Sequence, residues 1–145
     1  MATVPLISSG VAGPLGVLHL PRFWQKVVLK ATGSLHDEYP ECGGGFDAMV
    51  LGALGLDKDA TLAYLHENVP SYPAFEKWIL EQKGGSLDQG AVDEFNAAAR
   101  GYNHDDDTRK TILDGAGIVD DGSVLDAVNL NQLEDWTEFH QSLKK

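Results

Sequence analysis

The sequence predicts an all-α protein: a compact orthogonal bundle of six to eight helices with an extended N-terminal arm. Apolar residues recur at three- and four-residue spacing through most of the chain, and strand-like alternation is scarce. Capping residues and glycines divide these periodic segments at short intervals, which favours antiparallel neighbours. A chain of 145 residues has the size of one ordinary domain, so we predict one domain over residues 1–145.

Residues 1–20 are predicted to be the arm, packed in extended form on the helical body. The segment is apolar, but Pro5, Gly10, Gly13, Pro14 and Gly16 interrupt it and disfavour a helix. It lacks the positively charged leader of a secretory signal and never reaches the roughly 18 unbroken apolar residues of a membrane span. We therefore expect a protein without a targeting segment or a membrane partner.

The first half of the chain contains signals for four helices. The first is predicted to begin at Pro21, because proline suits the first helical position, and to end at Gly33. The second begins at Phe46, after three glycines, and ends at Gly55. Asp57 is typical of an N-cap and predicts the third helix, and a cap at Ser71 predicts the fourth.

The second half predicts three more helices. Ser86-Leu87-Asp88-Gln89 has the capping-box pattern, so we expect the fifth helix to open there. A shorter helix is predicted over Thr108–Asp114, where the preceding run Asp105-Asp106-Asp107 favours a capped, solvated helix start over a metal site. Asn131-Gln132-Leu133-Glu134 repeats the capping pattern and predicts the start of the last helix.

The tryptophans and His66 are predicted to have structural rather than functional roles. Trp24, Trp78 and Trp136 fall on apolar helical faces, so we predict that they belong to the core. His66 lies beside the inward stripe of its helix and is predicted to be a hydrogen-bonded histidine at the edge of the core.

The charge of the chain is unevenly distributed. The formal net charge is −11, yet residues 1–36 contain no acidic residue and hold Arg22, Lys26 and Lys30. An acidic body repels phosphate backbones and anionic lipids, so we expect neither nucleic acid nor membranes as partners. The basic segment either packs against the acidic body or anchors an anionic ligand. A single cysteine, Cys42, excludes an intrachain disulfide and fits a cytoplasmic location.

Several catalytic signatures are missing from the sequence. No two histidines lie three or four residues apart, and there is no Cys-x-x-Cys. Gly43-Gly44-Gly45 is not followed by the lysine and hydroxyl of a phosphate-binding loop, and no Gly-x-Ser-x-Gly elbow is present. These absences disfavour zinc proteases, nucleotide hydrolases, dinucleotide-dependent dehydrogenases and α/β-hydrolases, so we expect no cofactor and no metal.

The strongest candidate site is the acidic segment, His36 to Asp47, with the sequence HDEYPECGGGFD. Its ionisable side chains lie on a connection kept non-helical by proline and glycine. We predict catalytic roles for His36, Glu38, Tyr39 and Cys42, since such groups transfer protons, orient substrates or act as nucleophiles. The alternative is a solvated turn whose thiol is a small buried hydrophobe.

Two cations one helical turn apart, Arg22 and Lys26, share a face of the first helix. We predict that the acidic segment folds over this face and creates either an ion-pair network or a small polar pocket. In the pocket interpretation Arg22, Lys26 and Asp47 bind the substrate.

Several short motifs resemble an uncharacterised bacterial family, catalogued as domain of unknown function 5069. They are Leu20-Pro21-Arg22 with Lys26, Gly33-Ser34-Leu35, Cys42, Asp47, Leu54-Gly55-Leu56 and Trp78. The resemblance spans Leu18 to Lys83. The family has no assigned activity, so the resemblance implies no reaction, but it singles out the positions to test: Arg22, Lys26, Glu38, Tyr39, Cys42 and Asp47.

Three functions follow from these observations. The first is a small-molecule-binding protein or cofactor-independent enzyme, with a small anionic or polar ligand at the acidic segment. The second is an acidic helical module that binds another protein or forms a homodimer without catalysis. The third is a metal-binding protein that uses His36, His66 or His104 together with carboxylates.

Overall fold

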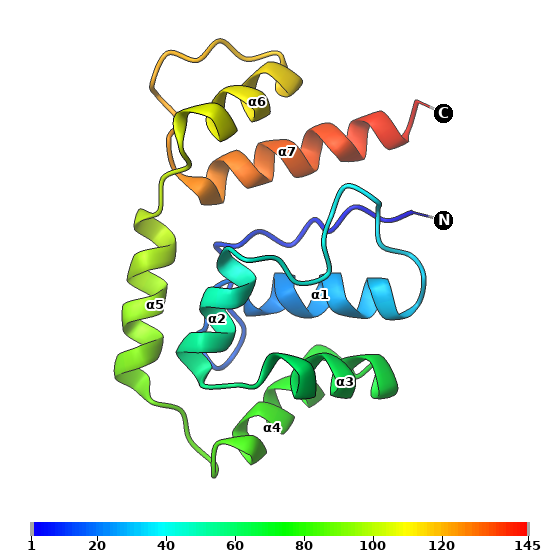
Figure 1. The fold of residues 1–145 in the computed structure, drawn as a ribbon, viewed down its shortest axis with the longest axis vertical. Helices are drawn as coiled ribbons and strands as arrows, with labels where there is room; N and C mark the ends of the chain where they lie inside the picture. Colours follow the sequence, from blue (N-terminus) through cyan, green and yellow to red (C-terminus); the bar gives the residue numbers. More distant parts are fainter. Residues whose placement is uncertain (1, 145) are drawn as a thin grey trace.

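The computed structural model describes residues 2–144 as seven helices and a long N-terminal arm (Figure 1). The helices are α1 (Leu20–Ala31), α2 (Phe46–Leu54), α3 (Lys58–Asn68), α4 (Tyr72–Gln82), α5 (Gln89–Gly101), α6 (Asp106–Ala116) and α7 (Ala127–Ser142). Within these residues strand-type pairing is limited to isolated bridges such as Thr3 with Leu35. The prediction of an all-α fold with six to eight helices is confirmed.

Short polar side chains fix where most helices begin. The side chains of Asp57, Ser71, Asp88, Asp105 and Asp126 each accept a hydrogen bond from the backbone N–H three residues later. Each bond satisfies one donor that the first helical turn leaves unpaired. The predicted caps at Asp57 and Ser71 are confirmed.

One predicted cap and one predicted helix start are wrong. The fifth helix opens at Ser86–Gln89 as predicted, but Asp88, and not Ser86, caps α5. The last helix begins before Asn131, because Asp126 caps it through the N–H of Asn129 at 3.0 Å. The pattern from Asn131 onward therefore lies inside α7, where its side chains are free to face other elements.

The predicted core position of Trp136 is also wrong, since this residue is 53% exposed. The buried residues of α7 are Ala127, Leu130 and Asp135, so the helix turns a different face inward. His66 is likewise more exposed than predicted; it lies on the surface of α3 and pairs with a carboxylate of the acidic segment.

The main apolar core lies in the body, which we define as the arm with α1 to α5. Phe23, Phe75 and Ile79 are fully buried there, and Trp24 and Trp78 pack at its edge. The arm crosses between α1 and α7 (Figure 1). It packs on the body as predicted, since Val4 and Val17 are buried.

We call the pair α6 and α7 the hairpin. It has a small core of its own, Ile112, Leu113 and Leu130. Figure 1 shows α5 beside α2, with its C-terminal end near the start of α7, so that it connects the two parts. None of the helices between residues 2 and 144 is long and apolar enough to cross a lipid bilayer.

Candidate functional site

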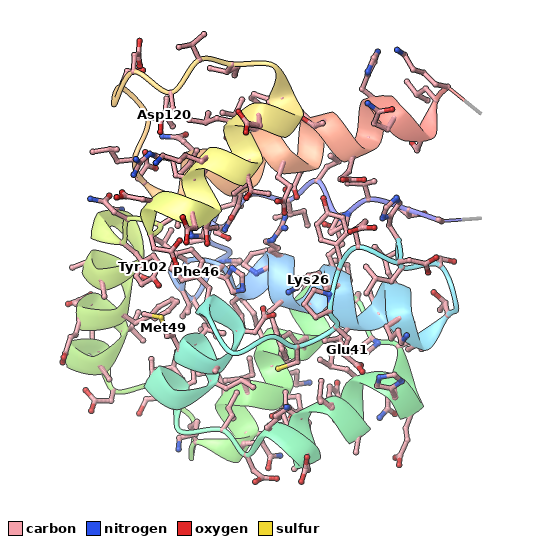
Figure 2. The ribbon with its side chains drawn as sticks, turned by 45° about the horizontal axis from the view of Figure 1, so that its top comes forward. Lys26, Glu41, Phe46, Met49, Tyr102 and Asp120 are labelled. Atoms are coloured by element: carbon pink, nitrogen blue, oxygen red, sulfur yellow. The ribbon has the colours of Figure 1, made fainter. Side chains whose placement is uncertain are left out.

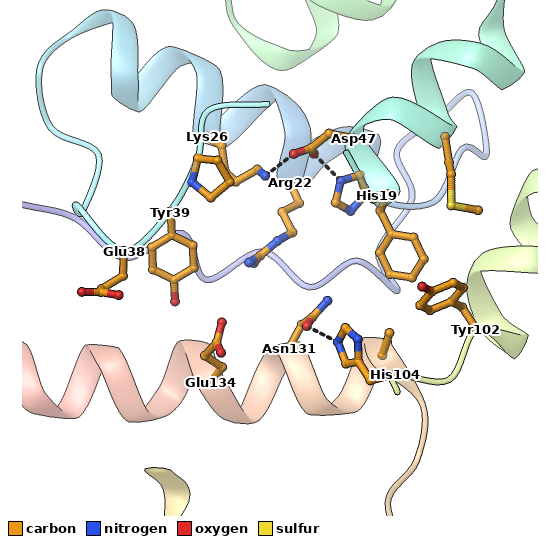
Figure 3. Close-up of a pocket in the computed structure, with 15 residues that line it drawn as sticks. His19, Arg22, Lys26, Glu38, Tyr39, Asp47, Tyr102, His104, Asn131 and Glu134 are labelled. Atoms are coloured by element: carbon orange, nitrogen blue, oxygen red, sulfur yellow. Dashed lines mark hydrogen bonds and ion pairs between the residues drawn. The ribbon is translucent and has the colours of Figure 1, made fainter. Parts of the chain in front are cut away.

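A cavity of about 280 Å³ lies where the body meets the hairpin (Figure 3). Its lining comes from α1, α2, α7, the acidic segment and the α5–α6 connection: His19, Arg22, Lys26, Glu38, Tyr39, Pro40, Gly45, Phe46, Asp47, Met49, Tyr102, His104, Ala127, Asn131 and Glu134. Charged side chains occupy one side, whereas Phe46, Met49 and Tyr102 gather where α2 faces α5 (Figure 2). A mainly apolar lining with a few converging polar groups is typical of small-molecule sites.

Asp47, in the first turn of α2, is the centre of one buried polar cluster. Its Oδ1 accepts a hydrogen bond from His19 Nε2 at 2.6 Å, and its Oδ2 accepts from the Gly43 N–H at 2.8 Å and from the Lys26 ammonium. Burial alone raises the pKa of Asp47, but the His19 hydrogen bond and the Lys26 charge outweigh it and lower the pKa from 3.8 to about 2. Asp47 is therefore a carboxylate whose two oxygens are both occupied.

His19 joins this cluster to the arm. Its Nδ1 lies 2.9 Å from the Ser9 hydroxyl, and its Nε2 faces Asp47. Burial lowers the pKa of His19 despite the neighbouring carboxylate. Because a carboxylate only accepts, the proton of the neutral ring belongs on Nε2, and Ser9 donates to Nδ1.

The Ser9–His19–Asp47 chain has the residue types of a serine-hydrolase triad, but its serine is enclosed in the protein. Ser9 is 1% exposed and does not line the cavity, so a substrate has no access to its hydroxyl. His19 also has a left-handed backbone, with φ of 69°, at the start of α1. Such a conformation costs about 1–2 kcal/mol in a non-glycine residue, and the two hydrogen bonds of the ring help to hold it.

A second buried cluster joins α1 to the hairpin. Two nitrogens of Arg22 donate to the two Asp135 oxygens, at 2.6 and 3.0 Å. The Arg22 Nη1 group also donates to the carbonyl oxygens of Pro5 and Ile7, at 3.2 and 3.0 Å. One guanidinium thus connects the arm, α1 and α7.

Tyr39 of the acidic segment completes this cluster. Its hydroxyl donates to Asp135 Oδ1 at 2.8 Å, and its ring centroid lies 5.8 Å from the Arg22 guanidinium carbon. Burial and the Asp135 charge raise the pKa of Tyr39, so it stays a protonated donor. The acidic segment folds over α1, as predicted, and forms both an ion-pair network and a pocket wall.

Two further carboxylates, Glu38 and Glu134, line the cavity, and both residues are exposed. Within residues 2–144, neither Glu38 nor Glu134 forms an ion pair. Glu134 rises from α7 toward Tyr39 and Arg22 (Figure 3). Burial and the neighbouring Asp135 charge raise the pKa of Glu134.

The other end of the cavity is aromatic. The rings of Phe46 and Tyr102 meet edge to face with centroids 5.6 Å apart, and Tyr102 meets the His104 ring at 6.2 Å. His104 Nε2 lies 2.8 Å from Asn131 Oδ1 on α7. This contact places the imidazole at the boundary between the aromatic and charged sides.

Five of the seven predicted site residues line the cavity. These are Arg22, Lys26, Glu38, Tyr39 and Asp47. They converge because the positions one turn apart on α1 face the returning acidic segment, which is the arrangement that the sequence predicts.

The remaining two, His36 and Cys42, are not brought into the cavity. His36 Nε2 lies 3.8 Å from the Glu138 carboxylate on α7. Cys42 is partly buried against the main core. Burial and the Asp47 charge raise the pKa of its thiol, which opposes formation of a nucleophilic thiolate.

Sequence reasoning missed half of the polar side chains that line the cavity. The missed groups are His19, Tyr102, His104, Asn131 and Glu134, together with Asp135 behind Arg22. Asn131 and Glu134 were missed because the sequence pattern places them in a helix cap, whereas they lie inside α7. The one usable signal for His19 was its place directly before Leu20-Pro21, next to the carboxylate-free first helix.

The histidines proposed for metal binding lie in separate places. His36, His66 and His104 face Glu138, Glu41 and Asn131, respectively. In the part of the chain that the structure describes, no group of three or more His, Cys, Asp or Glu side chains is placed to hold a metal ion.

Comparison with known proteins gives no relative: no family model, no curated protein and no solved structure matches this chain. The resemblance to domain of unknown function 5069 therefore stays a prediction.

Proposed function

We propose that this protein binds a small organic molecule in the cavity between the body and the hairpin. The observation that carries the proposal is the convergence of charged side chains from α1, α2, the acidic segment and α7 on one amphipathic cavity of about 280 Å³. Two buried ion pairs, Arg22 with Asp135 and Lys26 with Asp47, fix these side chains before any ligand arrives. Such preorganisation reduces the entropy lost on binding.

A catalytic version of this function needs a proton-transfer group with a free atom toward the ligand. Among the ionisable residues that line the cavity, Glu38, Glu134 and His104 are the candidates. Asp47 and His19 are not, because their polar atoms are occupied by each other and by their neighbours. A thiol mechanism through Cys42 is not supported by its position. We therefore favour binding, with acid–base chemistry at Glu134 or His104 as its enzymatic form.

A fragment screen by ligand-observed NMR tests the proposal. Met49→Trp places a larger side chain at the apolar end of the cavity, whereas Val119→Trp adds the same indole at a position that is 83% exposed. We expect fragments that bind the wild-type protein and Val119→Trp but lose most of their affinity for Met49→Trp. Fragments that bind all three proteins equally, or none at all, would contradict the proposal.

A second candidate function is a homodimer formed through α7. Trp136, Phe139 and Leu143 are 53%, 43% and 66% exposed and follow one another at helical spacing. Antiparallel packing of two copies would bury this stripe. Light scattering over a range of concentrations tests it: Trp136→Glu should abolish a dimer that Val119→Glu retains, and a wild-type protein that stays monomeric throughout rules it out.

We also propose a cytoplasmic location, supported by the single free cysteine, Cys42. Fractionation of cells that produce the tagged protein tests this, and recovery from an oxidising compartment would contradict it.

A further inference from the structure

We infer that the ligand of the cavity is a small organic cation, with an ammonium-type group near Glu134 and an apolar part against Phe46 and Tyr102. This inference rests on the proposed binding function and adds the chemical class of the ligand. It comes from the balance of charges around the cavity and from the arrangement of its aromatic side chains.

Both cations that line the cavity are already neutralised. Arg22 shares two hydrogen bonds with Asp135, and Lys26 pairs with Asp47, with each of the four side chains at most 8% exposed. An anionic ligand at either cation would therefore lie beside a buried carboxylate. Repulsion between like charges in a poorly solvated site is strong, so these cations do not provide a free anion site.

Within the described residues, the carboxylates of Glu38 and Glu134 line the cavity without a cation partner, and both residues are exposed at its mouth. Across residues 2–144 no Lys, Arg or His pairs with them. Glu134 directly precedes the buried Asp135 in the chain, and at the Glu134 carboxyl the charge of Asp135 outweighs that of its partner Arg22. A bound cation would relieve this repulsion and supply the partner that Glu134 lacks.

The start of α2 also lines the cavity and by itself favours an anion, because backbone N–H groups at a helix N-terminus carry partial positive charge. Asp47 already lies in the first turn of α2, and the nearby Gly43 N–H donates to it. The protein thus provides its own anion at this helix end. The remaining electrostatic preference of the cavity is for a cation.

The aromatic end suits the apolar part of such a ligand. Phe46 is buried and Tyr102 is 47% exposed, and their rings meet edge to face. Aromatic faces attract organic cations and pack against aromatic or aliphatic groups, with cation–π attractions of roughly 0.5–2 kcal/mol. Recognition would then combine one charge–charge contact with one apolar contact.

A matched series of three probes tests the inference: benzylamine, benzyl alcohol and benzoate. They share one aromatic ring and carry a positive, a neutral and a negative group, respectively. Isothermal titration calorimetry at neutral pH should show benzylamine binding at least tenfold more tightly than benzyl alcohol, and benzoate more weakly than either.

The variant Glu134→Gln should weaken benzylamine binding about tenfold, the loss expected for one charge-assisted contact, and leave benzyl alcohol unchanged. Glu67→Gln, at an exposed position on α3, removes the same unit of charge outside the cavity and should bind benzylamine as the wild-type protein does. Circular dichroism confirms that both variants are folded.

Three outcomes would overturn the inference: benzoate binding as tightly as benzylamine, equal affinity of Glu134→Gln and wild type for benzylamine, or no binding of any probe at millimolar concentration. The fragment screen with Met49→Trp decides the proposed function separately. Fragments that are neutral or anionic and still depend on Met49 would keep the cavity as a binding site while removing the preference for cations.

Discussion

The body and the hairpin differ in the forces that hold them in place. The body has a continuous apolar core, which Ala127 at the start of α7 also joins, whereas the hairpin's own core is small and consists of Ile112, Leu113 and Leu130. Polar contacts are prominent where the two parts meet, with Arg22 and Tyr39 both bonded to Asp135. The cavity lies at this polar boundary. A boundary held by directional bonds can keep polar groups at defined positions around a space that apolar packing would close.

The comparison predicts that the largest loss of hairpin stability comes from removing the charge of Asp135. Asp135→Asn leaves the Arg22 guanidinium buried without its anion, and removal of one partner of a buried pair costs about 3–5 kcal/mol. We expect a lower free energy of unfolding, and hydrogen exchange that accelerates more in α6 and α7 than in α1 to α4. Chemical denaturation and hydrogen-exchange mass spectrometry measure the two effects.

Asp114→Asn is the control for this variant, because it removes the same charge from an exposed position on α6. It should change stability by less than about 0.5 kcal/mol. Uniform acceleration of exchange across the whole chain by Asp135→Asn would show that the hairpin and the body unfold as one unit.

The cluster on the body side is expected to make stability depend on pH. The pKa of Asp47 is lowered from 3.8 to about 2, so the unfolded chain takes up this proton first as the pH falls. The corresponding stability, about 2 kcal/mol, is present above pH 4 and is lost between about pH 4 and pH 2. The pKa of His19 is also lowered, from 6.5, so its contribution is present above about pH 6.5 and is lost at lower pH.

His19→Asn isolates the loss that comes from His19, since asparagine tolerates the left-handed backbone at this position. Denaturation between pH 7.5 and pH 5 should show a smaller decrease in unfolding free energy for this variant than for the wild type. His140→Asn, at an exposed histidine of α7, should behave as the wild type. Identical slopes for all three proteins would refute the assignment of a buried neutral His19.

A smaller effect is expected from the hydroxyl of Tyr39. Tyr39→Phe keeps the ring over Arg22 but removes the hydrogen bond to Asp135, which costs about 1.5 kcal/mol for a charged acceptor. The matched variant in the body is Tyr72→Phe, which removes a 2.7 Å hydrogen bond to Glu76. Exchange in the hairpin should accelerate in Tyr39→Phe alone; the same acceleration in Tyr72→Phe would argue against a separate hairpin.

The sequence predicts one side of the cavity much better than the other. The spacing of Arg22 and Lys26 on a carboxylate-free helix, followed by an acidic segment, is a local pattern and predicts their meeting correctly. The bond from Arg22 to Asp135 joins residues 113 positions apart, and no local pattern encodes it. On α7 the apolar periodicity favoured burial of Trp136, whereas the structure buries the neighbouring Asp135, because the position of the Arg22 guanidinium decides which face turns inward.

The smallest predicted effect gives the most direct comparison of the two parts, because it makes one chemical change in each. Asp105 caps α6 and Asp57 caps α3, with side-chain bonds of 2.7 and 2.9 Å to the N–H groups of Thr108 and Ala60. Replacing either aspartate by alanine costs about 1 kcal/mol of helix stability. If the hairpin opens without the body, Asp105→Ala accelerates exchange throughout α6 and α7 and leaves α1 to α4 unchanged, since local opening requires only the loss of local bonds.

Asp57→Ala lies in the cooperative body, so its cost appears as faster exchange across α1 to α4 together. Should each variant instead accelerate exchange over the whole chain by the same factor, the apolar core and the polar boundary would form a single cooperative unit, and the cavity would be as rigid as the core beside it.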